Sequence, residues 1–175
     1  WTPAGLAKAE AWKAAIERTD GPTVLALSRQ KLPVFDRTRL GPAQGTRRGG
    51  YVLLDATGGA PDVIVIATGS EVSLALGAVE KLQNQGLAVR LVSLPSWELF
   101  EAQPVDYRES VLPSAVKRRV AVEAATSFGW RRWVGDEGAI IGIDHFGASA
   151  PADVLYRQFG FTQDRIVETV RQLLK

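Results

Sequence analysis

The sequence lacks cysteine and methionine altogether, and it contains a single histidine, His145. Without cysteine the chain cannot form a disulfide, a cysteine-ligated zinc or iron–sulfur centre, or a thiol nucleophile. Its 175 residues are enough for one ordinary domain with a buried core. Because the first residue is Trp1 rather than methionine, we expect the chain either to be processed or to be a segment of a longer protein.

A large excess of charge of one sign is also missing. The 21 Lys and Arg residues face 19 Asp and Glu residues, which leaves a formal net charge of +2. The basic pairs are spread along the chain and are not interleaved with aromatic residues, so we interpret them as solvated charges and expect no nucleic-acid partner. No apolar run approaches the roughly 20 residues that span a bilayer, and no signal peptide opens the sequence. We therefore expect a cytoplasmic protein with no membrane partner.

Short apolar runs alternate with amphipathic segments, a pattern that is typical of an α/β protein. Several runs are almost continuous Val, Ile and Leu, as expected for parallel strands that are covered on both faces. The predicted strands are Thr23–Leu27, Tyr51–Leu54, Val63–Thr68, Val89–Leu94, Arg119–Ala124 and Ala139–Ile143. With right-handed crossovers between them, these segments predict an α/β sandwich.

Helical spacing of apolar residues predicts the elements between and around the strands. The predicted helices run from Ala7 to Arg18, from about Glu71 to before Gly86, from about Pro151 to Phe159, and from Thr162 onwards. In the first helix we expect Trp12 and Ile16 to point inward. Residues 33–49 are rich in Arg, Gly and Pro without a sustained period, so we expect a linker there.

The turn that joins the third predicted strand to its helix carries the sequence ATGSE, Ala67–Glu71. Backbone N–H groups of Gly69 and Ser70 at the start of a helix could bind an anion. The turn lacks the glycine spacing of dinucleotide-binding and Walker motifs. A tight strand-to-helix turn, capped by the side chain of Thr68 or Ser70, explains it without any ligand.

Arg29 follows the first predicted strand directly, in the sequence Ser28-Arg29-Gln30. Open α/β sheets bind ligands beyond the carboxyl ends of their strands, and a guanidinium there could hold an anion with two hydrogen bonds. From spacing alone, a surface arginine paired with an acid is the alternative.

His145 lies beside Asp144 after the last predicted strand, and no motif places a serine nucleophile near them. One histidine and one aspartate are too few for a metal site, so we expect a structural histidine, no metal and no catalytic residue. Glu123 is the best placed single carboxylate for polar recognition, unless it holds a loop through backbone N–H groups. Trp130 and Trp133 are three residues apart, and we expect them to pack against a partner subunit.

Seven segments stand in an order that resembles the C-terminal third of the transketolase family, from about Ala11 to the end of the chain. They are GPTVLALSRQKLP, RGGYVL, IVIATGSEVSLAL, RLVSLPSWELFEAQ, YRESVLP, RVAVEA and HFGASAPADVLYRQFGFT. Related thiamine-diphosphate enzymes, such as deoxyxylulose-phosphate synthase, share the ATGSE-like turn.

The resemblance implies a three-layer sandwich with a mostly parallel, mixed five-stranded sheet. It implies that residues 1–32 are the end of a pyrimidine-binding domain, 33–49 a linker and 50–175 the C-terminal domain. Arg29 matches the family arginine that contacts the phosphate of the sugar substrate.

By the same resemblance, the full-length parent is a homodimer of the pentose phosphate pathway that moves a two-carbon ketol unit between sugar phosphates. It uses thiamine diphosphate and a divalent cation, Mg or Ca. The family's motifs for the metal, the diphosphate and the substrate channel are absent from this sequence. We therefore expect this chain alone to bind no cofactor, to be inactive, and to serve packing with the remainder of its parent.

Two alternatives stay open. The chain could be a regulatory module that binds an anion or a nucleotide at Gly69 and Ser70. It could also be the C-terminal domain of a related thiamine-diphosphate enzyme such as deoxyxylulose-phosphate synthase.

Overall fold

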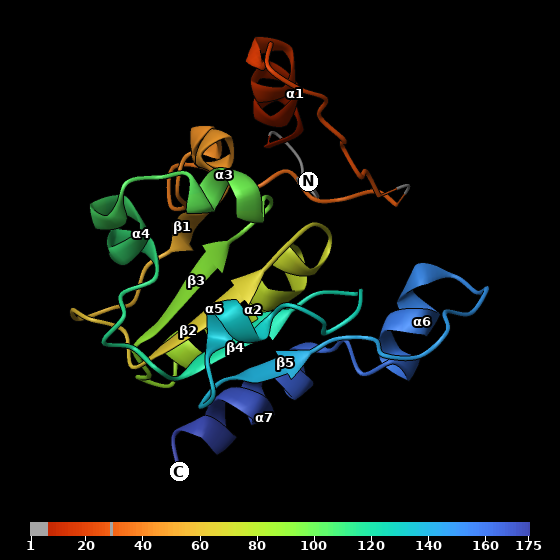
Figure 1. Cartoon of the computed structure of the whole chain (residues 1–175). Helices are drawn as coiled ribbons and strands as arrows, with labels where there is room; N and C mark the ends of the chain where they lie inside the picture. Colours follow the sequence, from red (N-terminus) through yellow and green to blue (C-terminus); the bar gives the residue numbers. More distant parts are fainter. Residues whose placement is uncertain (1–6, 29) are drawn as a thin grey trace.

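The computed structural model describes residues 7–28 and 30–175. Its strands are β1 (Tyr51–Leu54), β2 (Val63–Ala67), β3 (Val89–Ser93), β4 (Arg119–Val122) and β5 (Ala139–Ile141). They form one sheet in the order β1-β3-β2-β4-β5 (Figure 1). β1 runs antiparallel to β3, whereas the other neighbouring pairs are parallel. The predicted mixed, mostly parallel five-stranded sheet is therefore confirmed.

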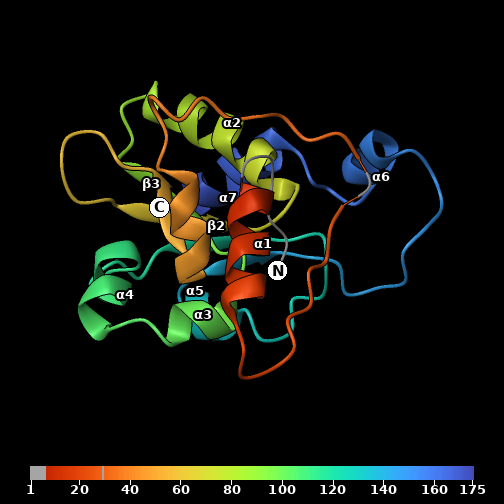
Figure 2. The same ribbon diagram turned by 90° about the horizontal axis from the view of Figure 1, so that it is seen from above.

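Helices cover both faces of this sheet (Figures 1 and 2). The helices of the described residues are α1 (Ala7–Glu17), α2 (Glu71–Gln83), α3 (Trp97–Glu101), α4 (Val105–Val111), α5 (Arg131–Val134), α6 (Ala152–Gln158) and α7 (Gln163–Leu173), together with the 3-10 helix η1 (Ala43–Arg48). α2 and α7 pack on one face, and α3, α4 and α5 pack on the other. The result is the three-layer sandwich that the resemblance implied.

Alternation along β2 builds both halves of the core. Val63, Val65 and Ala67 belong to the cluster beneath α2 and α7, whereas Ile64 and Ile66 belong to the cluster beneath α3, α4 and α5. Successive strand residues point to opposite faces, so a strand buried on both sides must be apolar throughout. The continuous VIVIA run of β2 is therefore the sequence signature of a central strand.

The predicted strand Thr23–Leu27 is wrong. In the structure residues 22–28 have no regular secondary structure, and Val24 and Leu27 are 78% and 42% exposed. A strand is held by the hydrogen bonds of a neighbouring strand, and no strand of the described residues pairs with this segment. The other five predicted strands are confirmed, with carboxyl ends up to two residues shorter than expected.

Helix α1 forms where it was predicted, but the expected orientation is wrong. Its buried residues are Ala7 and Ala11, whereas Trp12 and Ile16 are 53% and 76% exposed. α1 packs against η1, and the ion pair between Glu17 and Arg47 joins the two helices. The small alanine face is the one that allows this close approach, so the large apolar side chains point away from the rest of the described chain.

The helices of the described chain are all too short or too polar to cross a membrane.

Candidate functional site

A cavity opens where β2 and β4 end, beside the start of α2. The strand that follows β2 in the sequence, β3, lies on one side of it, and the next strand, β4, lies on the other side. The order of the parallel strands therefore reverses at this point. Open α/β sheets place their ligand sites at such a point. The cavity has a volume of about 230 Å³ and is lined by residues 26–28, 69–71 and 123–125.

The turn before α2 has the geometry that its sequence predicted. Gly69 has φ = 57°, a left-handed conformation that a residue with a Cβ adopts only under strain. Ser70 occupies the N-cap position, but its side chain makes no capping hydrogen bond. Its Oγ donates instead to Glu71 Oε1 at 2.7 Å. Of the two predicted caps, Thr68 or Ser70, the Ser70 cap is wrong, because the hydroxyl of Ser70 donates to the neighbouring carboxylate.

Glu71 is the centre of the polar contacts at this site. It is a buried carboxylate at the first position of α2, only 4% exposed, where the helix dipole favours negative charge. Besides Ser70 Oγ, it accepts hydrogen bonds from the hydroxyl of Tyr156 and from the backbone N–H of Ala124 at 3.3 Å. Glu71 therefore joins α2, α6 and the segment after β4.

Tyr156 extends this set of contacts to the N-terminal part of the chain. Its hydroxyl lies 2.8 Å from Ser70 Oγ and accepts a hydrogen bond from Gln30 Nε2 at 3.3 Å. Burial, followed by the negative charge of Glu71, raises the pKa of Tyr156 to about 12. The hydroxyl is therefore protonated at neutral pH and can donate to Glu71. We call Gln30, Ser70, Glu71 and Tyr156 the Tyr156 network.

Glu123 lines the same cavity and holds an aromatic side chain. Its Oε2 accepts from Trp130 Nε1 at 2.7 Å. Burial raises the pKa of Glu123, and the charge of Glu71 raises it further, whereas the Trp130 hydrogen bond lowers it. Glu123 therefore contacts this indole rather than the backbone N–H groups that were the alternative to polar recognition.

The two tryptophans pack inside the chain rather than against a partner. Trp130 and Trp133 are 1% and 7% exposed, and Trp97 makes edge-to-face contacts with both. The expectation of a subunit contact is therefore wrong. The short helix α5 turns both rings onto the sheet, where they complete the core beneath α3 and α4.

The anion predicted at Gly69 and Ser70 stays a prediction, and the surroundings of the turn weigh against it. The side chain of Glu71 already occupies the region near the helix start, and Glu123 lies across the cavity. A phosphate bound there would face two carboxyl groups at short range, which costs free energy in a partly desolvated site.

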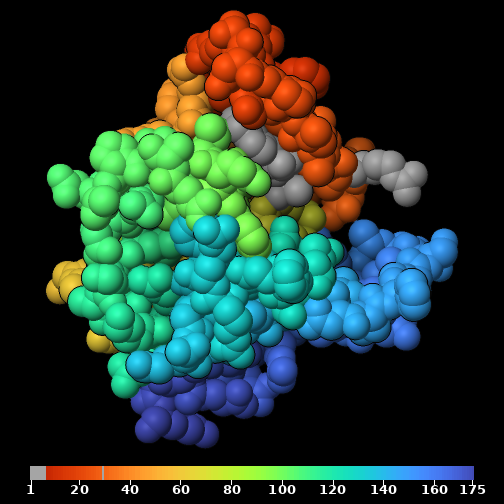
Figure 3. Space-filling view, viewed as in Figure 1, coloured from red at the N-terminus to blue at the C-terminus, as the bar shows by residue number. Residues whose placement is uncertain are grey.

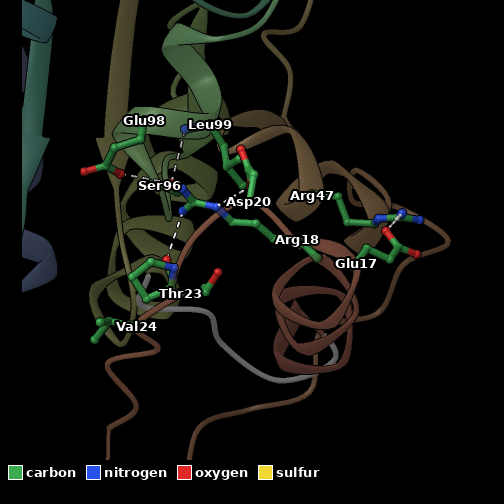
Figure 4. Close-up of a pocket in the computed structure, with 11 residues that line it drawn as sticks. Glu17, Arg18, Asp20, Thr23, Val24, Arg47, Ser96, Glu98 and Leu99 are labelled. Atoms are coloured by element: carbon green, nitrogen blue, oxygen red, sulfur yellow. Dashed lines mark hydrogen bonds and ion pairs between the residues drawn. The ribbon is translucent and has the colours of Figure 1, made fainter.

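A larger cavity of about 760 Å³ separates α1 and the following segment from α3 (Figure 4). Four of its charged groups are paired, Arg47 with Glu17 and Arg18 with Asp20 at 3.1 Å, whereas Glu98 accepts a hydrogen bond from Ser96 Oγ. On the other wall, Ser96 Oγ caps α3 by accepting from the N–H of Leu99. These contacts identify the cavity as a gap between α3 and the wall formed by α1 and its following segment, with α1 held to η1 by the ion pair of Glu17 with Arg47.

Of the remaining predicted residues, Arg29 lies outside the described residues. His145 is exposed, and its ring packs against Phe159 with the ring centroids 4.8 Å apart. Nowhere in residues 7–28 and 30–175 do three His, Asp or Glu side chains come together as metal ligands.

Sequence reasoning missed Tyr156 and Gln30. The available signal was weak: Tyr156 is the one aromatic residue within α6, a helix without any fully buried residue that stands out from the body of the molecule (Figure 3). A tyrosine in such a helix indicates a side chain that reaches back to a polar partner.

Comparison with known proteins assigns this arrangement to a family. The family model described as the transketolase-like TK C-terminal domain matches residues 49–162. The chain belongs to the transketolase family. It is 48% identical over 166 residues to the transketolase of Geobacillus stearothermophilus and 51% identical over 175 residues to transketolase 1 of Escherichia coli.

The fold agrees with this assignment. The transketolase from Leishmania mexicana superposes with a TM-score of 0.87 at 40% sequence identity, covering 98% of this chain and 24% of the other. The two curated transketolases are covered over 25% and 26% of their length, against 95% and 99% of this chain. The chain therefore corresponds to the C-terminal portion of a transketolase and spans about a quarter of these relatives.

Proposed function

We propose that the parent of this chain transfers a two-carbon ketol unit between sugar phosphates in the pentose phosphate pathway. The identity of 48–51% across almost the whole chain supports this proposal. Within it, Arg29 binds the phosphate of the sugar substrate. A planar guanidinium suits a phosphate dianion because it can donate two parallel hydrogen bonds.

Thiamine diphosphate and a divalent cation, Mg or Ca, belong to the parent under this proposal. The described residues of this chain do not fit the cation, because they contain no group of three metal-ligating side chains. We therefore assign both to parts of the parent outside this chain, and we propose that the chain alone is inactive.

The remaining role of the chain is packing. We propose that it contacts the remainder of the parent chain and contributes to a homodimer of the parent. The exposed Trp12, Ile16 and Val24 supply an apolar surface for such contacts. We place the parent in the cytoplasm, with a plastid as the alternative that chloroplastic relatives suggest.

The experiment that tests the proposal uses Arg29→Ala in the full-length parent. The KM is measured for an aldose phosphate and for the same aldose without its phosphate. Loss of a charged hydrogen-bonding partner should raise the KM for the phosphorylated aldose by about 10- to 100-fold and leave the other KM unchanged.

Arg118→Ala is the matched control. Arg118 is exposed and directly precedes β4. It therefore lies at the amino end of the parallel strands, whereas Ser28 lies near their carboxyl ends. It should change neither KM. An equal rise of both KM values in Arg29→Ala would contradict the assignment of Arg29.

A further inference from the structure

The segment that precedes the linker is tied to the C-terminal domain by a side-chain hydrogen bond. Gln30 Nε2 donates to the hydroxyl of Tyr156 at 3.3 Å, across 126 residues of sequence. Residues 22–28 have no strand partner that could hold them. The position of this segment therefore depends on side-chain contacts such as this one.

The other end of the bond is firmly held. The Tyr156 hydroxyl donates to Glu71, which is buried and fixed by Ser70 Oγ and by the N–H of Ala124. Glu71 in turn begins α2, which packs on the core of the sheet. Gln30 thus contacts a hydroxyl whose direction is set by a rigid part of the domain.

The hydrogen bonds of the network leave the tyrosine oxygen able to accept. The carboxylate of Glu71 can only accept, so the Tyr156 and Ser70 hydroxyls donate to it, either directly or with one hydroxyl donating to the other. A lone pair of the tyrosine oxygen then remains for the amide of Gln30. Burial and the charge of Glu71 keep the phenol protonated, so this arrangement persists at neutral pH.

We propose that Tyr156 is a positioning residue for sugar-phosphate binding, because it holds Gln30, the residue that directly follows Arg29 in the sequence. This inference rests on the proposed function of Arg29. It gives the C-terminal domain a specific part in substrate binding, in addition to packing, because Tyr156 and Glu71 both belong to that domain. Tyr156 acts through Gln30 and does not touch the substrate.

The test is Tyr156→Phe in the full-length holoenzyme, with the same pair of aldoses. Removal of one neutral hydrogen bond should raise the KM for the phosphorylated aldose about three- to tenfold. The KM for the unphosphorylated aldose and the kcat for both should stay unchanged. A merely structural role of Tyr156 would not separate the two substrates.

Tyr107→Phe is the matched control. Tyr107 is also a half-buried tyrosine whose pKa burial raises, and its hydroxyl donates to the carbonyl of Gly50 at 2.8 Å. It lies on α4, on the opposite face of the sheet from α2. Tyr107→Phe loses a comparable hydrogen bond and should leave both KM values unchanged.

Gln30→Met breaks the same bond from the other side and provides a second route if Tyr156→Phe fails to fold. It should produce the same phosphate-specific rise in KM. The double variant should show no more effect than either single variant, because both remove one shared contact. Additive effects would mean that the two residues act separately, which overturns the proposal.

Arg29→Ala separates failure of the inference from failure of the proposed function. If Arg29→Ala raises the KM only for the phosphorylated aldose while Tyr156→Phe changes nothing, the positioning role is wrong and the phosphate role stands. If Arg29→Ala shows no preference between the two aldoses, both are overturned. A phosphate-specific rise in both variants supports both.

Discussion

Residues 7–32 and residues 50–175 carry similar proportions of apolar side chains but use them differently. In the second region, every residue of β2 is fully buried. In the first, Ile16 and Val24 are 76% and 78% exposed, and the segment after α1 has no regular structure. Apolar patterning therefore specifies which face of an element is to be covered, whereas burial requires a second surface to cover it.

The exposed apolar side chains of the first region agree with the finding that the chain spans only part of the length of its relatives. The described residues enclose one complete sheet with helices on both faces, and they leave the apolar side of α1 uncovered. The first region is held by contacts that are exposed or partly exposed, such as those of Glu17 with Arg47 of η1 and of Gln30 with Tyr156 of the second region. We therefore expect a substitution in the second region to lower the free energy of unfolding far more than a comparable substitution in the first.

The largest contrast should come from removing one large apolar side chain in each region. Leu91→Ala in β3 should lower the free energy of unfolding of the 175-residue chain by about 2–5 kcal/mol, because Leu91 is fully buried and leaves a cavity. Ile16→Ala in α1 should change it by no more than about 0.5 kcal/mol. Urea unfolding followed by circular dichroism measures both, and equal losses would contradict the comparison.

A second contrast concerns arginine. The half-buried Arg119 guanidinium donates to the carbonyls of Val116, Trp133, Leu112 and Pro113 at 2.7–3.2 Å. Arg119→Met leaves these carbonyls without that donor and should cost about 2–3 kcal/mol.

Arg18 supplies the matched control in the first region. It donates to Asp20 and to the carbonyl of Pro22 on an exposed surface. Arg18→Met should therefore cost no more than about 0.5 kcal/mol in the same urea experiment. A loss of 2 kcal/mol there would show that the first region is as firmly held as the sheet.

The third prediction uses the raised pKa of Glu123. A carboxyl group whose pKa is higher in the folded state contributes stability below its unfolded pKa of about 4.3, and this stability is lost as the pH rises through the folded value. Glu123→Gln removes the titration and keeps an acceptor for Trp130. The variant should therefore gain stability relative to the wild type as the pH rises from 4 to 7.

Thermal unfolding at a series of pH values measures this difference. Asp20→Asn, which removes the same charge from an exposed site in the first region, is the control for loss of charge itself. A constant difference between Glu123→Gln and the wild type from pH 4 to 7 would contradict the raised pKa.

The sequence predicted most of the fold, because the elements of the sheet domain bury their own apolar faces. The five strands and the helices α2, α6 and α7 follow from period and from flanking glycine, proline and threonine. The prediction failed at Thr23–Leu27 and on α1, where the local pattern marks apolar side chains that the rest of the described chain leaves exposed. The apolar pattern predicts which residues are suited to a strand, but a strand forms only when a neighbouring strand supplies the backbone hydrogen bonds.

The candidate site was less predictable than the fold. The Ala67–Glu71 turn could be placed from its glycine, yet the Tyr156 network joins residues 30, 71 and 156 through contacts that sequence spacing does not encode. The tryptophans show the same limit. Their spacing indicated one helical face, but the direction of that face was decided by how α5 packs on the sheet.

The smallest expected effect concerns the contact of α1 in the first region with η1, which lies between the two regions in the sequence. Arg47→Ala removes the ion pair with Glu17, in which both side chains are partly exposed, so the global free energy of unfolding should change by no more than about 0.5 kcal/mol. Ala7 and Ala11 are then left to hold α1 against η1. Because local opening can cost far less than global unfolding, the amides of α1 should exchange with solvent several-fold faster while those of β2 and β4 do not change.

Hydrogen exchange read by mass spectrometry distinguishes these segments. Faster exchange in the strands as well would mean that α1 and the sheet unfold as one unit, and the two regions would then have to be treated as a single cooperative structure.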